Sequence, residues 1–310
     1  MRSPIIAPEA LAAWIADDRP DLRVVDVRWY LGQPPGTGRA AYDAGHIPGA
    51  IHLDIDTDLV AHDGPGRHPL PDPVAFARRL GERGIGDGDT VVAYDDVGGW
   101  VAARLWWMLD DLGFGAGGRG GALVLDGGIL AWTAAGLALS TAVPARPPAG
   151  LHLASSWRRV VDRAALKPWL GEVLLLDARG APRYRGETEP IDPVAGHIPT
   201  ALNAPTDGNL DSEGRFRLAA DLAERFAGLR AQAGEAGMPA AADPSAPLVT
   251  SCGSGVSACH NALALRIAGL PDPLLYPGSY SDWSRAGEPV AVGPEPGTPP
   301  SATPATPPVR

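Results

Sequence analysis

A cysteine that could act as a nucleophile lies in the C-terminal half of the chain. Cys252 opens the sequence Cys-Gly-Ser-Gly-Val-Ser-Ala-Cys and follows a short apolar run at residues 248–251. This run predicts a buried strand. Apolar residues at helical spacing from Val256 to Ile267, with Gly269 after them, predict a helix that ends there. We therefore expect Cys252 in a loop that joins a strand to a helix.

Such a loop would stabilise a negative charge. The first turn of a helix has unpaired backbone N–H groups and the positive end of the helix dipole. Gly253 and Gly255 allow the loop to turn its amides inward. Together these features favour the thiolate of Cys252, the reactive form of the side chain. The alternative is a buried structural cysteine, but the small polar residues and glycines around Cys252 favour the reactive interpretation.

The spacing argues against other cysteine chemistries. A cysteine-dependent phosphatase needs an arginine six residues after the cysteine to bind the phosphoryl oxygens, and Ala258 stands there. The second cysteine, Cys259, is too far from Cys252 for a C-x-x-C redox motif or an ordinary zinc site. We predict that Cys259 packs as a small apolar residue, and we expect no metal site.

The segment from Cys252 to Asn261 resembles the active-site loop of the two-domain rhodanese and 3-mercaptopyruvate sulfurtransferase family, in which the cysteine carries sulfur as a persulfide. The uncharged Gly253 and Ser254 are more similar to the mercaptopyruvate branch, because the thiosulfate branch typically has cationic side chains in this loop. The resemblance implies a sulfurtransferase with Cys252 as nucleophile and no metal or organic cofactor. It also makes the loop residues candidates for binding substrate through their amides: Gly253, Gly255, Val256 and Ser257.

An internal repeat indicates two copies of one domain. Alternating strand and helix patterns in both halves predict an α/β fold with tandem duplicated rhodanese-like domains, each a mostly parallel sheet flanked by helices. Asp95 follows the strand that corresponds to residues 248–251, so the first copy lacks the nucleophile and is expected to be inactive. Three pairs of landmarks recur at an offset of 151 residues: Asp26 with Asp177, Gly45 with Gly196 in two Gly-His-Ile-Pro segments, and Trp132 with Trp283.

Composition sets the expected domain boundaries. Residues 1–143 form the N-terminal domain, the proline-rich residues 144–155 a linker, and residues 156–292 the catalytic domain. Residues 293–310 are rich in proline and threonine and have almost no apolar side chain to bury, so we predict a disordered tail.

Three further residues are candidates for the site. The resemblance implies that His46, in the first Gly-His-Ile-Pro segment, handles protons together with Ser254; no acidic partner is identified. A local role for this histidine in a turn is the alternative. Arg183 matches the first of two substrate-binding arginines of the family, whereas Asp192 stands at the second position and removes one anion contact. Arg185 is interpreted as a solvated charge.

Charge and hydrophobicity exclude other functional classes. The 310 residues carry a formal net charge of −10, which argues against a nucleic-acid partner. No segment has the roughly 18 apolar residues that a membrane span requires. Because Cys252 is needed as a free thiol, we expect a reducing compartment and cytoplasmic localisation.

The sequence thus predicts transfer of sulfur from 3-mercaptopyruvate, through a persulfide on Cys252, to a thiol, thioredoxin or cyanide. One alternative is a thiosulfate sulfurtransferase that uses the same residues. The other is a non-catalytic rhodanese-like sulfur carrier or interaction module. Retention of the cysteine in the second copy, beside its loss in the first, favours catalysis.

Overall fold

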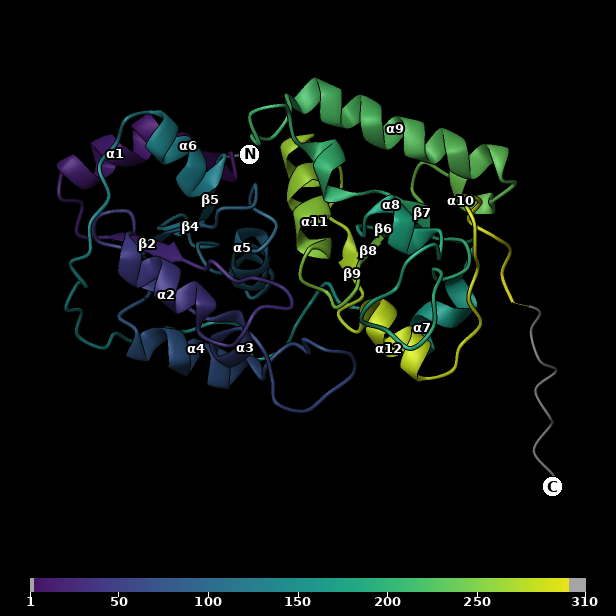
Figure 1. The fold of residues 1–310 in the computed structure, drawn as a ribbon, viewed down its shortest axis with the longest axis horizontal. Helices are drawn as coiled ribbons and strands as arrows, with labels where there is room; N and C mark the ends of the chain where they lie inside the picture. Colours follow the sequence, from purple (N-terminus) through teal and green to yellow (C-terminus); the bar gives the residue numbers. More distant parts are fainter. Residues whose placement is uncertain (1–2, 301–310) are drawn as a thin grey trace.

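The computed structural model describes residues 3–300, which form two α/β domains side by side (Figure 1). The N-terminal sheet has the strand order β1-β5-β4-β2-β3 and the C-terminal sheet the order β7-β6-β8-β9, with every neighbouring pair parallel. The predicted fold class is confirmed. The strands are β1 (Ile5–Ile6), β2 (Leu22–Asp26), β3 (Ile51–His52), β4 (Thr90–Tyr94), β5 (Gly121–Leu125), β6 (Leu174–Asp177), β7 (Leu202–Asn203), β8 (Leu248–Ser251) and β9 (Leu274–Leu275).

Helices cover the sheets, and two of them join the domains. Helix α5 of the N-terminal domain packs against α11 of the C-terminal domain, and the large side chains of Trp106 and Trp107 on α5 are buried. The long helix α9 lies along the outside of the C-terminal domain (Figure 1). The helices are α1 (Pro8–Ala16), α2 (Thr37–Ala44), α3 (Ile55–Asp58), α4 (Pro73–Glu82), α5 (Ala102–Asp111), α6 (Gly128–Ala134), α7 (Arg163–Leu166), α8 (Ala181–Tyr184), α9 (Ala219–Glu235), α10 (Pro239–Ala242), α11 (Ala258–Ile267) and α12 (Ser279–Arg285), with 3₁₀ turns at Lys167–Trp169 and Thr206–Asn209.

The central strand β8 determines where a site can form. It lies between β6 and β9, and all three run in the same direction. Three of its four residues are apolar or β-branched, and three are buried, as expected for a strand that is covered on both faces. In open parallel sheets ligands bind beyond the carboxyl ends of the strands, and Cys252 is the first residue beyond β8.

The repeated Asp-x-Arg sequence has the same structural role in both domains. Asp26 and Arg28 form a buried ion pair, and Nη2 of Arg28 donates to the carbonyl of Gly45 at 2.8 Å. In the second domain Arg179 pairs with Asp177, and its Nη2 donates to the carbonyl of Gly196, also at 2.8 Å. This part of the repeat therefore fixes the turn at each Gly-His-Ile-Pro segment.

The segment between the domains packs on the N-terminal domain. Ala149 donates its N–H to the carbonyl of Gly81 at 2.9 Å, and the carbonyl of Gly150 accepts from Asp87 at 3.0 Å. The indole of Trp157 stacks on Trp107, with ring centroids 5.8 Å apart. The segment thus fixes one domain relative to the other.

The tail that we expected to be disordered from residue 293 onward makes ordered contacts at its start. The carbonyl of Glu295 lies 3.1 Å from Nε2 of His197, and Thr200 donates its N–H to the carbonyl of Pro296 at 2.6 Å. The expectation is therefore wrong for this first part, because backbone hydrogen bonds and the burial of Pro296 hold it in place. Residues 301–310 lie outside the described residues.

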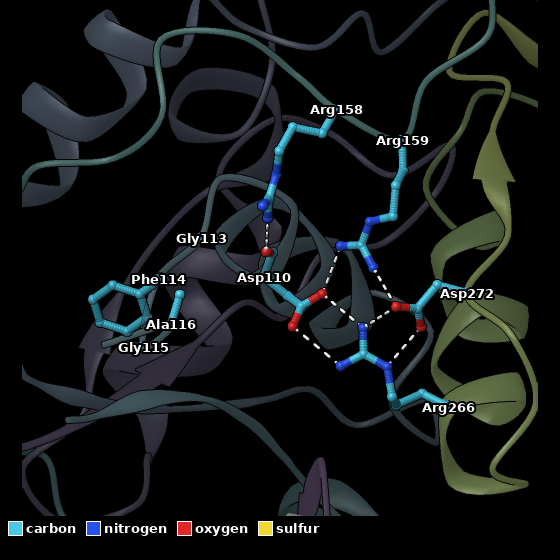
Figure 2. A pocket seen from close by; sticks show the side chains of 9 residues that line it. All are labelled: Asp110, Gly113, Phe114, Gly115, Ala116, Arg158, Arg159, Arg266 and Asp272. Atoms are coloured by element: carbon cyan, nitrogen blue, oxygen red, sulfur yellow. Dashed lines mark hydrogen bonds and ion pairs between the residues drawn. The ribbon is translucent and has the colours of Figure 1, made fainter. Parts of the chain in front are cut away.

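A cluster of ion pairs ties the two domains together (Figure 2). Arg159, just after the linker, and Arg266, in the last turn of α11, each bind both Asp110 of α5 and Asp272. The cluster borders a cavity of about 440 Å³ that shares no lining residue with the cavity at Cys252. Because Arg159 and Arg266 are already paired with carboxylates, we interpret the cluster as an interdomain tie.

Within residues 3–300, no helix combines the length and the hydrophobicity that crossing a bilayer requires.

Candidate active site

The structure places Cys252 in the strand-to-helix loop that the sequence predicted. The residue is 2 % exposed, and α11 begins at Ala258. The Sγ atom accepts hydrogen bonds from the backbone N–H groups of Ser254 (3.4 Å) and Gly255 (3.1 Å). Gly255 has φ +78°, and a Cβ there would lie 2.4 Å from the carbonyl oxygen of Pro277, so only glycine fits. The loop therefore surrounds the sulfur with donors.

The same loop offers further amides. Among the interactions of residues 3–300, the N–H groups of Val256, Ser257 and Ala258 donate to no acceptor. They lie at the start of α11, where unpaired N–H groups and the helix dipole favour an anion. An atom carrying negative charge beyond Sγ would therefore find donors already in place.

The N-terminal copy shows what this kind of loop does with a negatively charged side chain. Asp95 is fully buried and takes the place of the cysteine. Its Oδ1 accepts from the amides of Val97 and Gly99, and its Oδ2 from those of Val101 and Ala102, all at 2.8 to 3.0 Å. The amides of the N-terminal loop thus form an anion-binding site, and the carboxylate of Asp95 from the same loop occupies it.

Ser254 has a histidine partner that we did not predict. Its hydroxyl lies 2.7 Å from Nδ1 of His68, and Nε2 of His68 lies 3.5 Å from Oδ1 of Asp56. The indole N–H of Trp29 donates to the other oxygen of Asp56 at 2.8 Å. The interaction with His68 lowers the pKa of the Asp56 carboxyl, with the bond from Trp29 acting in the same direction. Serine, histidine and aspartate form a chain that can carry a proton to or from the loop.

His46 is not the partner of Ser254, and this prediction is wrong. Its ring is fully buried and stacks on Tyr42, with centroids 3.9 Å apart. Its two nitrogens face the carbonyls of Tyr42 (2.9 Å) and Ala142 (3.1 Å). His197 in the second copy stacks on its own tyrosine in the same way. The Gly-His-Ile-Pro histidines therefore hold turns, which was the alternative interpretation.

Cys252 opens onto a cavity of about 190 Å³ lined by both domains. Arg183 lines it, as the sequence predicted, and so does Arg67 of the N-terminal domain, which the sequence analysis missed. Apolar walls come from the indoles of Trp29 and Trp100. Of the loop residues expected to bind substrate, Gly253, Val256 and Ser257 line the cavity, whereas Gly255 contributes its amide to Sγ instead.

A buried arginine joins the two halves of the site. Arg104 of α5 is fully buried and donates to the carbonyls of Gly255 and His68, both at 3.0 Å. Burial lowers the pKa of its guanidinium. Gly255 belongs to the cysteine loop, and His68 contacts Ser254. Arg104 therefore fixes the histidine relative to the cysteine.

Cys259 is fully buried on α11, and its thiol donates to the carbonyl of Gly255 at 3.4 Å. Burial raises the pKa of this thiol to about 12. It is therefore a neutral packing residue at physiological pH, as predicted. Within residues 3–300 no group of three or more histidine, cysteine or acidic side chains has a geometry that could hold a metal ion.

Two parallel-sheet domains, one with a cysteine in an amide-lined loop and one with an aspartate in the same loop, define a class of tandem α/β enzymes. The family described as rhodanese-like domain matches the chain twice, at residues 7–135 and 162–286. The chain belongs to this family, and within it to the two-domain sulfurtransferases.

Several relatives cover nearly the whole chain. The probable 3-mercaptopyruvate sulfurtransferase of Pseudomonas aeruginosa is 43 % identical over 295 residues, which span 93 % of this chain and 98 % of the relative. The putative thiosulfate sulfurtransferase SseB of Mycobacterium tuberculosis is 37 % identical over 286 residues, 90 % of this chain and 93 % of the relative. The crystal structure of the 3-mercaptopyruvate enzyme SseA from Escherichia coli matches with a TM-score of 0.73 and 29 % identity, covering 90 % of this chain and all of that one.

Proposed function

We propose that the protein transfers sulfur from 3-mercaptopyruvate to a thiol acceptor through a persulfide on Cys252. The observation that carries the choice of donor is the Ser254–His68–Asp56 chain. Removal of sulfur from mercaptopyruvate leaves the enolate of pyruvate, which must take up a proton. Thiosulfate leaves as sulfite and needs none. A proton-carrying chain beside the nucleophile therefore suits the first donor.

The first half-reaction forms an S–S bond as the C3–S bond of the donor breaks. The thiolate of Cys252 attacks the donor sulfur, and the electron pair of the broken bond goes to the enolate. Ser254, with His68 behind it, delivers the proton to C3 and gives pyruvate. The amides of Val256, Ser257 and Ala258 stabilise the outer sulfur of the persulfide, as the amides around Asp95 stabilise its carboxylate.

In the second half-reaction an acceptor attacks the outer sulfur and releases the thiolate of Cys252. A small thiol, a thioredoxin or cyanide has the required nucleophilicity. The acceptor takes the sulfur with its new bond, and the electrons of the broken S–S bond stay on Cys252. No external oxidant or reductant is consumed, because the two electrons that the donor sulfur gives up remain on C3, which becomes the methyl group of pyruvate.

Thiosulfate is the second candidate donor, and one observation favours it. The loop's own residues are uncharged, but Arg67 and Arg183 supply two cations to the cavity from other segments. They could bind a sulfonate. Proton delivery by Ser254 and His68 favours mercaptopyruvate, whereas the charges of the two arginines favour thiosulfate. The preferred donor depends on which of these effects contributes more to the rate.

Steady-state transfer to cyanide separates these donors. We expect kcat/KM for mercaptopyruvate to exceed that for thiosulfate at least tenfold, or about 1.4 kcal/mol of transition-state free energy. Cys252→Ala should abolish transfer, whereas Cys259→Ala, as a matched buried cysteine, should retain most of it. Mass spectrometry should show a 32 Da adduct on Cys252 after incubation with donor alone, a mass set by one sulfur atom. A turnover rate that survives in Cys252→Ala would contradict the proposal.

A further inference from the structure

Two guanidinium groups from outside the loop lie against Gly253. A Cβ at this position would be 2.8 Å from Nη2 of Arg67 and 3.5 Å from Nη1 of Arg183. The space that a longer loop side chain would need is therefore taken by Arg67. The guanidinium that lies nearer to Gly253 comes from the N-terminal domain, from the residue immediately before His68.

A buried carboxylate holds these two arginines together. The side chain of Asp192 is fully buried, with Oδ1 bound to Nη1 of Arg67 and Oδ2 lying 3.4 Å from Nη2 of Arg183. Glu189 binds the guanidinium of Arg183 as well, at 2.7 Å. We call Arg67, Arg183 and Asp192 the clamp. The backbone of Arg67 is fixed too, since its N–H donates to the hydroxyl of Ser281 at 3.1 Å.

The guanidinium of Arg67 in the clamp has N–H groups that donate to no acceptor within residues 3–300. Nε of Arg67 is buried and has no hydrogen-bond partner among the described residues. A buried N–H without an acceptor is costly. Nη2 of the same guanidinium also donates to no acceptor in the described part of the chain, and it is not among the buried atoms, so a ligand in the cavity can reach it. The side chain lines the cavity onto which Cys252 opens. An anionic group of the donor in that cavity would meet the guanidinium of Arg67.

The charges around the cavity balance. Its arginines are Arg67, Arg179 and Arg183, and the carboxylates bound to them are Asp177, Glu189 and Asp192. Three cations therefore face three anions. For a second negative charge on the donor, the attraction to the arginines is offset by the repulsion from the carboxylates, whereas its hydration is still lost. Balanced charge thus favours a singly charged donor.

We propose that Arg67 binds the anionic group of the sulfur donor, and that Asp192 makes the clamp select a singly charged donor over a doubly charged one. This inference rests on the sulfur transfer proposed above. It gives Asp192 a role in donor selection, at a position where the sequence analysis noted only the loss of an arginine. It also explains why a chain with an uncharged loop keeps a cation beside that loop.

The first test replaces Arg67. Arg67→Met keeps the length of the side chain and removes its charge, and leaves the three arginines and three carboxylates around the cavity with a net charge of −1. We expect kcat/KM to fall at least tenfold for mercaptopyruvate and by a larger factor for thiosulfate, with partial recovery in Arg67→Lys. The control is Arg185→Met, which removes an arginine paired with the exposed Glu187 and should stay within twofold of wild type. Equal activities of Arg67→Met and Arg185→Met would overturn the binding role.

The second test reverses the charge change. Asp192→Asn keeps the shape of the side chain and leaves the same six positions with a net charge of +1, so the ratio of kcat/KM for thiosulfate to that for mercaptopyruvate should rise at least fivefold. In Arg67→Met the same ratio should fall, and in the double variant, where the charges balance again, it should return to the wild-type value. Loss of structure alone would change both donors by the same factor. A ratio that is constant across the three variants overturns the charge selection.

Detection of a persulfide on the wild-type enzyme distinguishes a failure of the proposed sulfur transfer from a failure of the inference about the clamp. An adduct on Cys252 with either donor supports the sulfur transfer, and the donor ratios of the variants then decide the role of the clamp. Absence of the adduct with both donors would overturn the proposed function and this inference with it. An adduct in the wild type with unaltered donor ratios in the variants would overturn only the inference.

Discussion

His68 and His46 are both buried, yet their partners differ in a way that sets their roles. His68 lies between a serine hydroxyl and a carboxylate, groups that can give and take a proton. His46 faces two backbone carbonyls, which can only accept hydrogen bonds. Only the first environment can relay a proton to a reacting molecule.

From this contrast we predict the effects of two substitutions. His68→Gln should lower kcat with mercaptopyruvate by about 10² to 10⁴, the usual contribution of a positioned acid or base. It should lower kcat with thiosulfate by less than tenfold, because sulfite leaves without a proton. Stopped-flow measurement of pyruvate release would give the rate of the first half-reaction directly.

His46→Gln serves as the matched control. It should lower the melting temperature, since it removes a ring stacked on Tyr42, but leave the ratio of the two donors unchanged. A loss of equal size for both donors in His68→Gln would contradict the relay and make His68 a positioning residue only.

At the scale of the elements, the strand-to-helix loops of the two copies show how much local sequence can predict. Cys252 was found because its position depends on neighbours within about 20 residues: an apolar run, glycines and a helical pattern. His68 could not be found this way, because it lies 186 residues from Ser254 in a segment without periodicity. The family resemblance pointed to His46 instead, although the presence of Gly-His-Ile-Pro in both copies indicates a structural role.

The loop of the first copy leads to a prediction about stability. Asp95→Ala should destabilise the protein by about 3 kcal/mol or more, because four backbone N–H groups would lose their acceptor in a buried place. The control is Asp43→Ala, which removes an exposed i,i+4 pair with Arg39 and should cost about 0.5 kcal/mol or less. Urea unfolding measures both.

Similar midpoints for the two aspartate variants would show that the carboxylate of Asp95 does not hold its loop. If the prediction holds, the carboxylate of Asp95 occupies the place in its loop that the persulfide anion of Cys252 takes in the second loop during turnover. The same amide-lined loop would then serve structure in one copy and catalysis in the other.

On the scale of the whole molecule, each domain contributes a loop that contacts the other domain. Gly-Arg-His-Pro-Leu at residues 66–70 brings His68 to the cysteine loop. Its counterpart, Gly-Arg-Phe-Arg-Leu at residues 214–218, brings Phe216 to the first domain, where its N–H donates to Asp126 at 2.9 Å. The histidine therefore stands where the other copy has a phenylalanine. Comparison of the copies at the positions where they differ would have pointed to it.

The interface between the domains also contains a buried histidine, which predicts how stability depends on pH. His260 of α11 stacks on Phe216, and its Nε2 lies 3.1 Å from the carbonyl of Gly98 in the first domain. On its other side, Asn209 lies 3.0 Å from Nδ1. Burial, together with the charge of Arg225, lowers the pKa of His260 to about 4.

Acid should therefore weaken the native state through this residue. In the unfolded chain the imidazole takes up a proton as the pH falls below its ordinary pKa of about 6.5, whereas in the native protein it stays neutral until the pH reaches about 4. The unfolded state binds more protons within this window, so the free energy of unfolding falls with pH, by at most about 3 kcal/mol from this group. Above pH 6.5 the group has no effect.

His260→Gln tests this, because glutamine can still donate to the carbonyl of Gly98 but does not titrate. Urea unfolding at pH 7.5, 5.5 and 4.5 should show a smaller loss of stability with acid in this variant than in the wild type. His62→Gln, at an exposed position, should follow the wild-type curve. Parallel curves for wild type and His260→Gln would mean that the interface tolerates a charged histidine and that other groups cause the acid sensitivity. A flatter curve for the variant would identify the neutral His260 as part of what keeps the two halves of the active site together.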